Sequence, residues 1–231
     1  MWGVLTSADP LGNFFRPVSR QIYFWMLSRI GGESSTLFHT VNLSIFLVSL
    51  LVLYALARRL AGRTAAVFAI AFVGFHYAAD VPVQWASGCQ DLLAVLFATL
   101  TVYLHVRGQR ALAAMAFLLG VLSKEAVAGA AIVAIVASHA SQERWGVTLR
   151  RGVALLAVAA SWGAWWLWSL WLRPAAAHAL SFDLASVPAA FVHLIQVTLS
   201  LEVRQGGGVL GHWQAQALLA SAVAAAVVWL A

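Results

Sequence analysis

Residues 37–60 read LFHTVNLSIFLVSLLVLYALARRL, and this stretch decides the fold class. The run is apolar, with scattered small polar side chains, until it reaches the arginine pair Arg58-Arg59. A helix needs about 20 mainly apolar residues to cross the hydrocarbon core of a bilayer, which is about 30 Å thick. Residues 37–60 therefore predict a membrane-spanning α-helix that ends at a positively charged boundary.

The composition of the whole chain extends this prediction. Its 231 residues are 62% hydrophobic and 10% charged, whereas soluble domains carry about 25% charged residues. Because so few polar side chains cannot cover a soluble domain of this size, lipid is the expected solvent. We predict an all-α, polytopic transmembrane helical bundle with about seven spans. The net charge of +6 then places arginines at span ends and favours membrane lipids, not nucleic acid, as partners.

Hydropathy predicts a single transmembrane domain over 1–231. Its expected parts are an extracytoplasmic loop at 1–36 with an interfacial helix at 17–30, a six-span core at 37–172, a second extracytoplasmic loop at 173–213 with an interfacial helix at 187–201, and a last span at 214–231. The six core spans are expected at 37–60, 65–79, 91–106, 111–122, 126–138 and 152–172. In the helix at 17–30, Ile22, Trp25 and Ile30 share an apolar face, and Gln21 and Arg29 lie opposite.

Charge sets the expected orientation. The links after the first, third and fifth spans carry arginines, and the positive-inside rule places those links in the cytoplasm. These arginines are Arg58, Arg59, Arg63, Arg107, Arg110, Arg144, Arg150 and Arg151. Seven of the eight acidic residues fall on the opposite side, Glu143 being the exception. We therefore expect an integral protein of a bacterial inner membrane whose active site faces away from the cytoplasm.

The two ends of the chain suggest a fragment. Arg16, Arg20 and Arg29 would have to cross the membrane without a preceding helix, and the last apolar run stops with no polar tail. We expect a longer protein that is truncated here at both ends and lacks its first transmembrane helix.

The pair Lys124-Glu125 interrupts an apolar stretch. Charged residues at membrane depth cost about 2.5–3.5 kcal/mol each on insertion scales. One interpretation is a tight helical hairpin whose turn reaches the interface, where the two charges partly neutralise each other. The other is a functional site, in which Lys124 binds an anionic head group such as a phosphate beside an acid.

Three further residues are candidates for the same site, each with a structural alternative. Asp91 begins an apolar run, where the helix dipole alone stabilises an acid. Arg16 precedes the interfacial helix, where an arginine can extend to lipid phosphates in general or hold one phosphate through two hydrogen bonds. His76 ends an apolar run and either satisfies a helix terminus or lines the site. The tryptophan-rich run at 162–171 predicts an aromatic belt or a packing surface.

Taken in order, these pieces resemble the GT-C membrane glycosyltransferases, in particular the branch similar to protein O-mannosyltransferases. The resemblance covers about residues 14–135. Its motifs are FRPVS at 15–19, FHTVNL at 38–43, His76 followed by VQWASG at 83–88 and DLL at 91–93, and LSKE at 122–125.

The resemblance implies transfer of a sugar from a polyprenyl-phosphate donor to a protein, lipid or glycan acceptor, with inversion of the anomeric centre. In such enzymes an acid in the first outer loop acts as the base, and a second acid at the start of a later helix supports the site. Asp91 matches this second, catalytic position. By the same resemblance Lys124 and Arg16 contact the donor phosphate, and His76 and Glu125 complete the substrate-binding site. No cofactor is implied, and a divalent metal ion stays an open alternative.

The sequence departs from the family at three points. Tyr77 follows His76 where the family has proline, and Cys89 stands where it has arginine. The expected first helix and its catalytic acid are absent, since Asp9 lies too close to Arg16 to be that base. We therefore do not expect the fragment to catalyse by itself. Two other functions stay open: a transporter, because short helices broken by charges occur at transport sites, and a noncatalytic subunit or degenerate paralogue.

Overall fold

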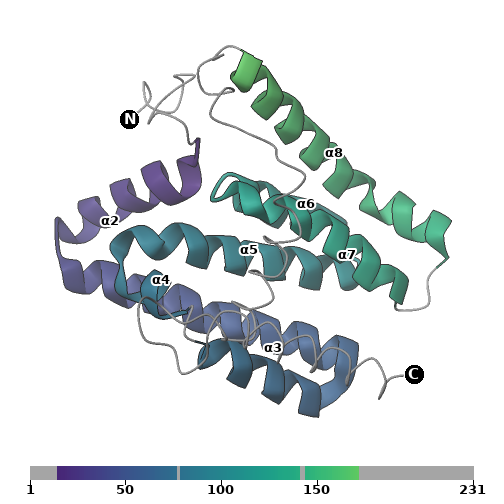
Figure 1. Ribbon diagram of the computed structural model, residues 1–231, viewed down its shortest axis with the longest axis horizontal. Helices are drawn as coiled ribbons and strands as arrows, with labels where there is room; N and C mark the ends of the chain where they lie inside the picture. The colour runs from purple at the N-terminus through teal and green to yellow at the C-terminus, as the bar shows by residue number, and fades with distance from the viewer. Residues whose placement is uncertain (1–14, 77–78, 141–143, 172–231) are drawn as a thin grey trace, which may run out of the picture. The chain divides into compact units, whose positions relative to one another are not determined.

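The computed structural model describes residues 15–76, 79–140 and 144–171, and every regular element in these ranges is helical (Figure 1). The elements are η1 (Pro17–Ile22), α2 (Tyr23–Gly31), α3 (Ser35–Gly74), α4 (Asp80–Gln84), η3 (Ala86–Gly88), α5 (Cys89–Val106), α6 (Arg110–Val121), η4 (Glu125–Ala128), α7 (Gly129–Ala140) and α8 (Trp145–Trp171). The all-α class is thus confirmed for the described residues. The loop predicted at 173–213, its helix at 187–201 and the span at 214–231 lie outside them.

The chain divides into two compact units. All described residues except His76 belong to the first, which comprises Met1–Phe75 and Ala79–His178. His76 belongs to the second unit with Ala179–Ala231. The helices described below are therefore those of the first unit.

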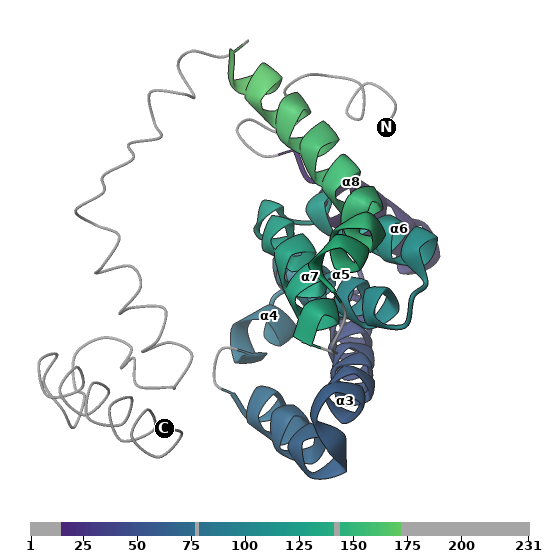
Figure 2. The ribbon, with the colours of Figure 1, turned by 90° about the vertical axis from the view of Figure 1, so that its right-hand side faces the viewer.

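Helix α3 is a hairpin of two helices. It begins at Ser34, whose hydroxyl caps the backbone N–H of Leu37, and it is broken at Gly62, where φ is 88° and ψ is 178°. A positive φ of this size favours glycine over any residue with a Cβ. The two halves return on each other, because a Cβ on Gly74 would lie 3.5 Å from Leu50 Cδ1 (Figure 2). The break predicted between the spans at 37–60 and 65–79 is confirmed.

The core lies around α5, which packs against α3, α6 and α7, while α8 covers α6 and α7 (Figures 1 and 2). Its fully buried large side chains include Phe117, Val121 and Leu155, from α6 and α8. Alanines fill much of the rest, and a Cβ on Gly120 would lie 2.6 Å from Val127 Cγ1. Small residues let apolar helices approach closely, as in membrane bundles.

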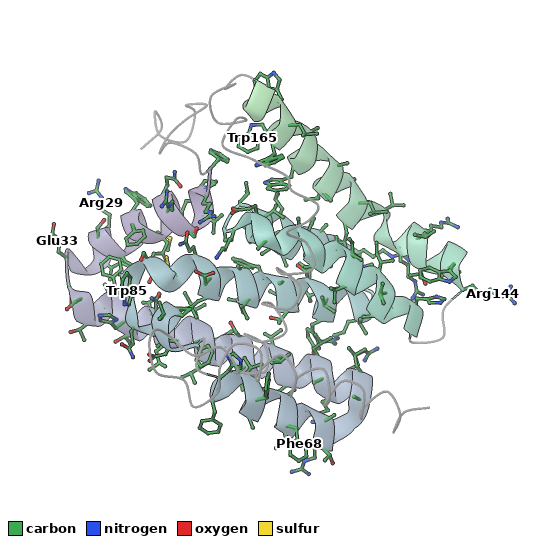
Figure 3. The ribbon with its side chains drawn as sticks, in the orientation of Figure 1. Arg29, Glu33, Phe68, Trp85, Arg144 and Trp165 are labelled. Atoms are coloured by element: carbon green, nitrogen blue, oxygen red, sulfur yellow. The ribbon has the colours of Figure 1, made fainter. Side chains whose placement is uncertain are left out.

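The helices gather the arginines of the predicted links at one end of the first unit. The first half of α3 runs parallel to α5, because Phe38 and Leu93 share one cluster near the starts of the two helices, and Leu56 and Val102 share another further along. The turn of α3, the turn between α5 and α6, and the start of α8 consequently share one end, which carries the arginines. Figure 3 shows Arg144 at that end, and Arg29, Glu33 and Trp85 at the other. The link arginines therefore share one end, as the sequence predicts, while the opposite end carries both signs of charge.

Two described helices are long and apolar enough to cross a membrane, Ser35–Gly74 and Ala86–Val106. The segments Arg110–Val121 and Glu125–His139 are shorter apolar helices. Membrane-length helices are thus present, whereas the number of spans stays a prediction.

Two predicted links turn out to be helical. The loop expected at 80–90 contains α4 and η3, because Asp80 lies in the first turn of α4 and accepts a hydrogen bond from Gln84 one turn later. Helix α8 begins at Trp145 and not at 152, so Arg150 and Arg151 lie inside it. Arginine is among the best helix formers, so a charged link between apolar runs need not be a loop.

The helix predicted at 17–30 is confirmed, as η1 followed by α2. The apolar residues Ile22, Trp25 and Ile30 are exposed, by 36%, 46% and 71%. Gln21 is buried, and neither of its amide atoms has a hydrogen-bond partner in the described residues. It therefore lies opposite the exposed apolar residues, as predicted, and η1 packs this polar side against the protein.

Candidate functional site

Four of the five predicted site residues lie together, at the end of the first unit opposite the link arginines. Arg16 immediately precedes η1, Asp91 lies in the first turn of α5, and Lys124 and Glu125 form the turn that follows α6. The fifth, His76, belongs to the second unit, so its place relative to these residues is not described.

Arg16 binds Glu125 through two hydrogen bonds from its guanidinium. Arg16 Nε donates to Glu125 Oε2 at 2.9 Å, and Nη2 donates to Oε1 at 2.5 Å. Nη1 donates to Gln90 Oε1 at 2.6 Å. The Arg16 side chain is 9% exposed and that of Glu125 is 43% exposed. This two-point geometry is the strong form of an arginine–carboxylate pair, and it buries the arginine while the acid stays accessible.

Lys124 forms the second ion pair of the cluster, with Asp91. Its ammonium donates to Asp91 Oδ1. Both side chains are accessible, at 28% for Lys124 and 40% for Asp91. The first turn of α5 therefore holds both cations, since Gln90 binds Arg16 and Asp91 binds Lys124. We call Arg16, Gln90, Asp91, Lys124 and Glu125 the polar cluster.

The turn that carries Lys124 and Glu125 is held by η1. Helix α6 ends at Val121, and Lys124 is extended, with φ −159° and ψ 134°. The backbone N–H of Val18 donates to the carbonyl of Leu122 at 3.2 Å, and Ser19 Oγ donates to the carbonyl of Ser123 at 2.7 Å. Two carbonyls of the turn after α6 are thus bonded by the π-helical element η1, and π-helical turns are frequent at functional sites.

The electrostatics of the cluster favour an ionised Glu125. Burial raises the pKa of the Glu125 carboxyl, but the hydrogen bonds from Arg16 and from its own backbone N–H lower it, as do the charges of Arg16 and Lys124. The net pKa lies below the ordinary value for glutamate. Glu125 is therefore a carboxylate at neutral pH and is poorly suited to donate a proton.

A second network fixes the segment that leads into α5. The hydroxyl of Tyr23 donates to Asn42 Oδ1 at 2.7 Å, and Asn42 Nδ2 donates to the carbonyl of Trp85 at 2.8 Å. A Cβ on Gly88 would overlap the backbone of Pro82, so this close approach requires glycine. Through these contacts α2 and α3 fix where α5 begins, and hence where Asp91 lies.

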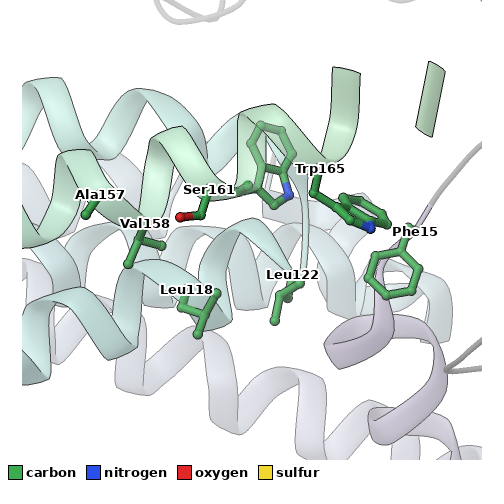
Figure 4. A pocket seen from close by; sticks show the side chains of 8 residues that line it. Phe15, Leu118, Leu122, Ala157, Val158, Ser161 and Trp165 are labelled. Atoms are coloured by element: carbon green, nitrogen blue, oxygen red, sulfur yellow. The ribbon is translucent and has the colours of Figure 1, made fainter. Parts of the chain in front are cut away.

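An apolar groove lies between α6 and α8 (Figure 4). It has a volume of about 490 Å³ and is lined by Phe15, Leu118, Leu122, Ala157, Val158, Ser161, Trp162 and Trp165. The rings of Phe15 and Trp165 lie 4.5 Å apart at one side of it. Phe15 is the neighbour of Arg16 in the chain, and Leu122 precedes Lys124 by two residues. The groove and the polar cluster are therefore linked through neighbouring residues of the chain, and no side chain of the cluster lines the groove.

Sequence reasoning found the charged residues of the cluster but not the residues that hold them. Gln90 lies beside Asp91, yet a glutamine at a helix start carries no signal of its own. Ser19 and Ser123 lie within the quoted FRPVS and LSKE motifs, and membership of these motifs was the only feature of the sequence that could have marked them as site residues. Two tryptophans of the run at 162–171 line the groove, so that run is more than an aromatic belt. In the described residues no group of three or more His, Cys, Asp or Glu could hold a metal ion.

No protein-family profile, curated protein or solved structure matches the chain.

Proposed function

We propose that the chain belongs to an extracytoplasmic glycosyltransferase of the GT-C type, which transfers a sugar from a polyprenyl-phosphate donor with inversion. The observation that carries the proposal is the apolar groove, whose lining residues Phe15 and Leu122 are close in the chain to Arg16 and Lys124 of the polar cluster. A polyprenyl-phosphate sugar has a long hydrocarbon tail, an anionic phosphate and a polar sugar. A groove lined by apolar side chains suits the tail, and the accessible cation Lys124 suits the phosphate.

The membrane arrangement is part of the same proposal. About seven spans cross the bilayer, with the arginine end in the cytoplasm. The segment formed by η1 and α2 lies in the opposite interface, because its exposed residues Ile22, Trp25, Met26 and Ile30 form an apolar stripe and it also carries Arg20 and Arg29. The polar cluster then lies at the extracytoplasmic surface of the membrane, where a lipid-linked donor presents its head group.

In the reaction an acceptor oxygen attacks the anomeric carbon, the bond from that carbon to the phosphate oxygen breaks, and the acceptor proton passes to a base. Negative charge develops on the departing phosphate. Lys124 stabilises this charge, and a fixed cation is most effective in a site of low dielectric. Asp91 holds Lys124 in place. The described residues contain no counterpart of the family's base, so they supply the donor-binding part of the site.

Sugar transfer by the full-length protein in proteoliposomes tests the proposal. A panel of polyprenyl-phosphate sugars is offered, and transfer is expected from at least one. Lys124→Ala and Asp91→Asn should lower the rate by about tenfold or more, the effect of losing about 1.4 kcal/mol of transition-state stabilisation. Arg29→Ala is the matched control, because Arg29 is exposed on α2, away from the cluster. Wild-type rates in both cluster variants, or solute uptake without any transfer, would refute the proposal.

A further inference from the structure

We propose that Arg16 is a positioning residue that holds and neutralises Glu125, so that Lys124 is the cation that contacts the donor phosphate. This inference rests on the donor-binding function proposed above and divides the roles among the residues of the polar cluster. Chain position alone would give Arg16 and Lys124 the same role, since both are cations at one face.

The guanidinium of Arg16 is already committed within the protein. Three of its N–H groups are directed to Glu125 and Gln90, at 2.9, 2.5 and 2.6 Å. Its side chain is 9% exposed. A planar fork bound at two points to a carboxylate cannot bind a phosphate in the same way without releasing that carboxylate. Arg16 is therefore placed to orient Glu125.

Lys124 has the opposite character. Its ammonium has three N–H groups, and in the described part of the chain Asp91 is its one hydrogen-bond partner. Its side chain is 28% exposed. It can thus keep Asp91 and still donate to an anionic oxygen. A compact charge on a flexible stem suits a ligand that must bind and leave.

The neighbouring carboxylate explains why Arg16 matters for binding. The charge of Lys124 acts on the Glu125 carboxyl, so a phosphate on Lys124 would also meet the charge of Glu125. Paired with Arg16, Glu125 contributes no net charge. Without Arg16 its charge would repel the phosphate, since like charges disfavour each other at short range.

Gln90 aligns this arrangement. It lies beside Asp91 in the first turn of α5 and accepts from Arg16 Nη1. Two adjacent residues of α5, Gln90 and Asp91, therefore fix the two cations. In the turn after α6, Lys124 supplies the contact with the phosphate, and its neighbour Glu125 carries the negative charge that must be neutralised. The geometry points to Gln90 as a second positioning residue.

Binding of farnesyl phosphate to the purified full chain in detergent tests the proposal, with farnesol as the uncharged control ligand. Arg16→Met should weaken binding about tenfold, which corresponds to about 1.4 kcal/mol. Adding Glu125→Gln should restore most of this affinity, because it removes the uncompensated charge. The same addition should not restore Lys124→Met, since the contact itself is missing. Arg29→Met, on the exposed side of α2, serves as the matched control and should bind like the wild type.

Failure of Glu125→Gln to restore Arg16→Met would overturn the proposal, because Arg16 would then contact the phosphate itself. If Arg16→Met does not fold, Glu125→Gln alone decides the matter. It should bind farnesyl phosphate more tightly than the wild type, and weaker binding would overturn the assignment. A wild type that binds farnesyl phosphate no better than farnesol refutes the proposed function, whereas wild-type binding without rescue refutes only the division of roles.

Discussion

Replacing Ser19 with alanine removes a hydroxyl that holds the turn carrying Lys124 and Glu125. Ser19 Oγ donates to the carbonyl of Ser123 at 2.7 Å, and both residues are 0% exposed. In Ser19→Ala no water reaches the freed carbonyl. A buried polar group left without its partner costs about 1–3 kcal/mol. We expect the free energy of unfolding to fall by about this amount, and binding of farnesyl phosphate to weaken because Lys124 follows Ser123 directly.

Ser28→Ala is the matched control for this prediction. Ser28 Oγ also donates to a backbone carbonyl, that of Trp25 at 3.0 Å, but the bond is exposed and water can replace it. Its expected effect lies within about 0.5 kcal/mol. Unfolding is followed by tryptophan fluorescence during denaturant titration in one detergent. If the two variants lose the same stability and bind the ligand alike, the bond from Ser19 does not hold the turn.

Three further predictions concern the hairpin, the ion pair and the groove. Gly62→Ala should destabilise by about 1–2 kcal/mol, because φ there is 88°, whereas Gly129→Ala, with open space around its Cβ, should not; denaturant titration compares them. The pKa of Glu125 is lower in the folded chain than its unfolded value of about 4.3. The ionised Glu125 therefore stabilises the folded state at a pH above the unfolded pKa, and this contribution is lost as the pH falls through the folded pKa. Unfolding measured between about pH 6 and pH 3 should show this loss, and Glu125→Gln should remove its part of the slope. Leu118→Trp should fill the groove and weaken binding of long polyprenyl phosphates more than that of short ones, with Met115→Trp, on an exposed part of α6, as the control; equal losses at all chain lengths would contradict the placement of the tail.

Apolar runs and their interruptions predicted most of the helices. The break at Gly62 and the turn at Lys124 were both visible, because charges cluster there between long apolar stretches. The start of α8 was placed too late, since Arg150 and Arg151 suggested a link although arginine is a good helix former. Periodicity placed Gln21, in η1, opposite the apolar face but did not say that the protein covers it, because periodicity describes how a helix is patterned and not which side is covered.

Local pattern also could not separate the structural from the functional interpretations of the site. For Lys124-Glu125 the alternatives were a self-neutralising pair and an anion site. The structure shows a third arrangement, in which each residue pairs with a partner elsewhere in the chain, Lys124 with Asp91 and Glu125 with Arg16. The sequence analysis had assigned these four residues to one site by resemblance, but it gave no reason for which cation would pair with which acid.

The sequence by itself determined the class of the molecule: apolar helices of membrane length, with the arginines of the predicted links at one end. Composition and hydropathy suffice to predict this class, because whether a segment prefers lipid or water depends on its own residues and not on distant parts of the chain. Only the tertiary structure decided which charges meet. Arg16 and Glu125 are 109 residues apart and Asp91 and Lys124 are 33 apart, and they meet because η1 docks on the end of α6 while α5 packs beside it. Contacts at such separations are set by packing, and that packing also forms the groove.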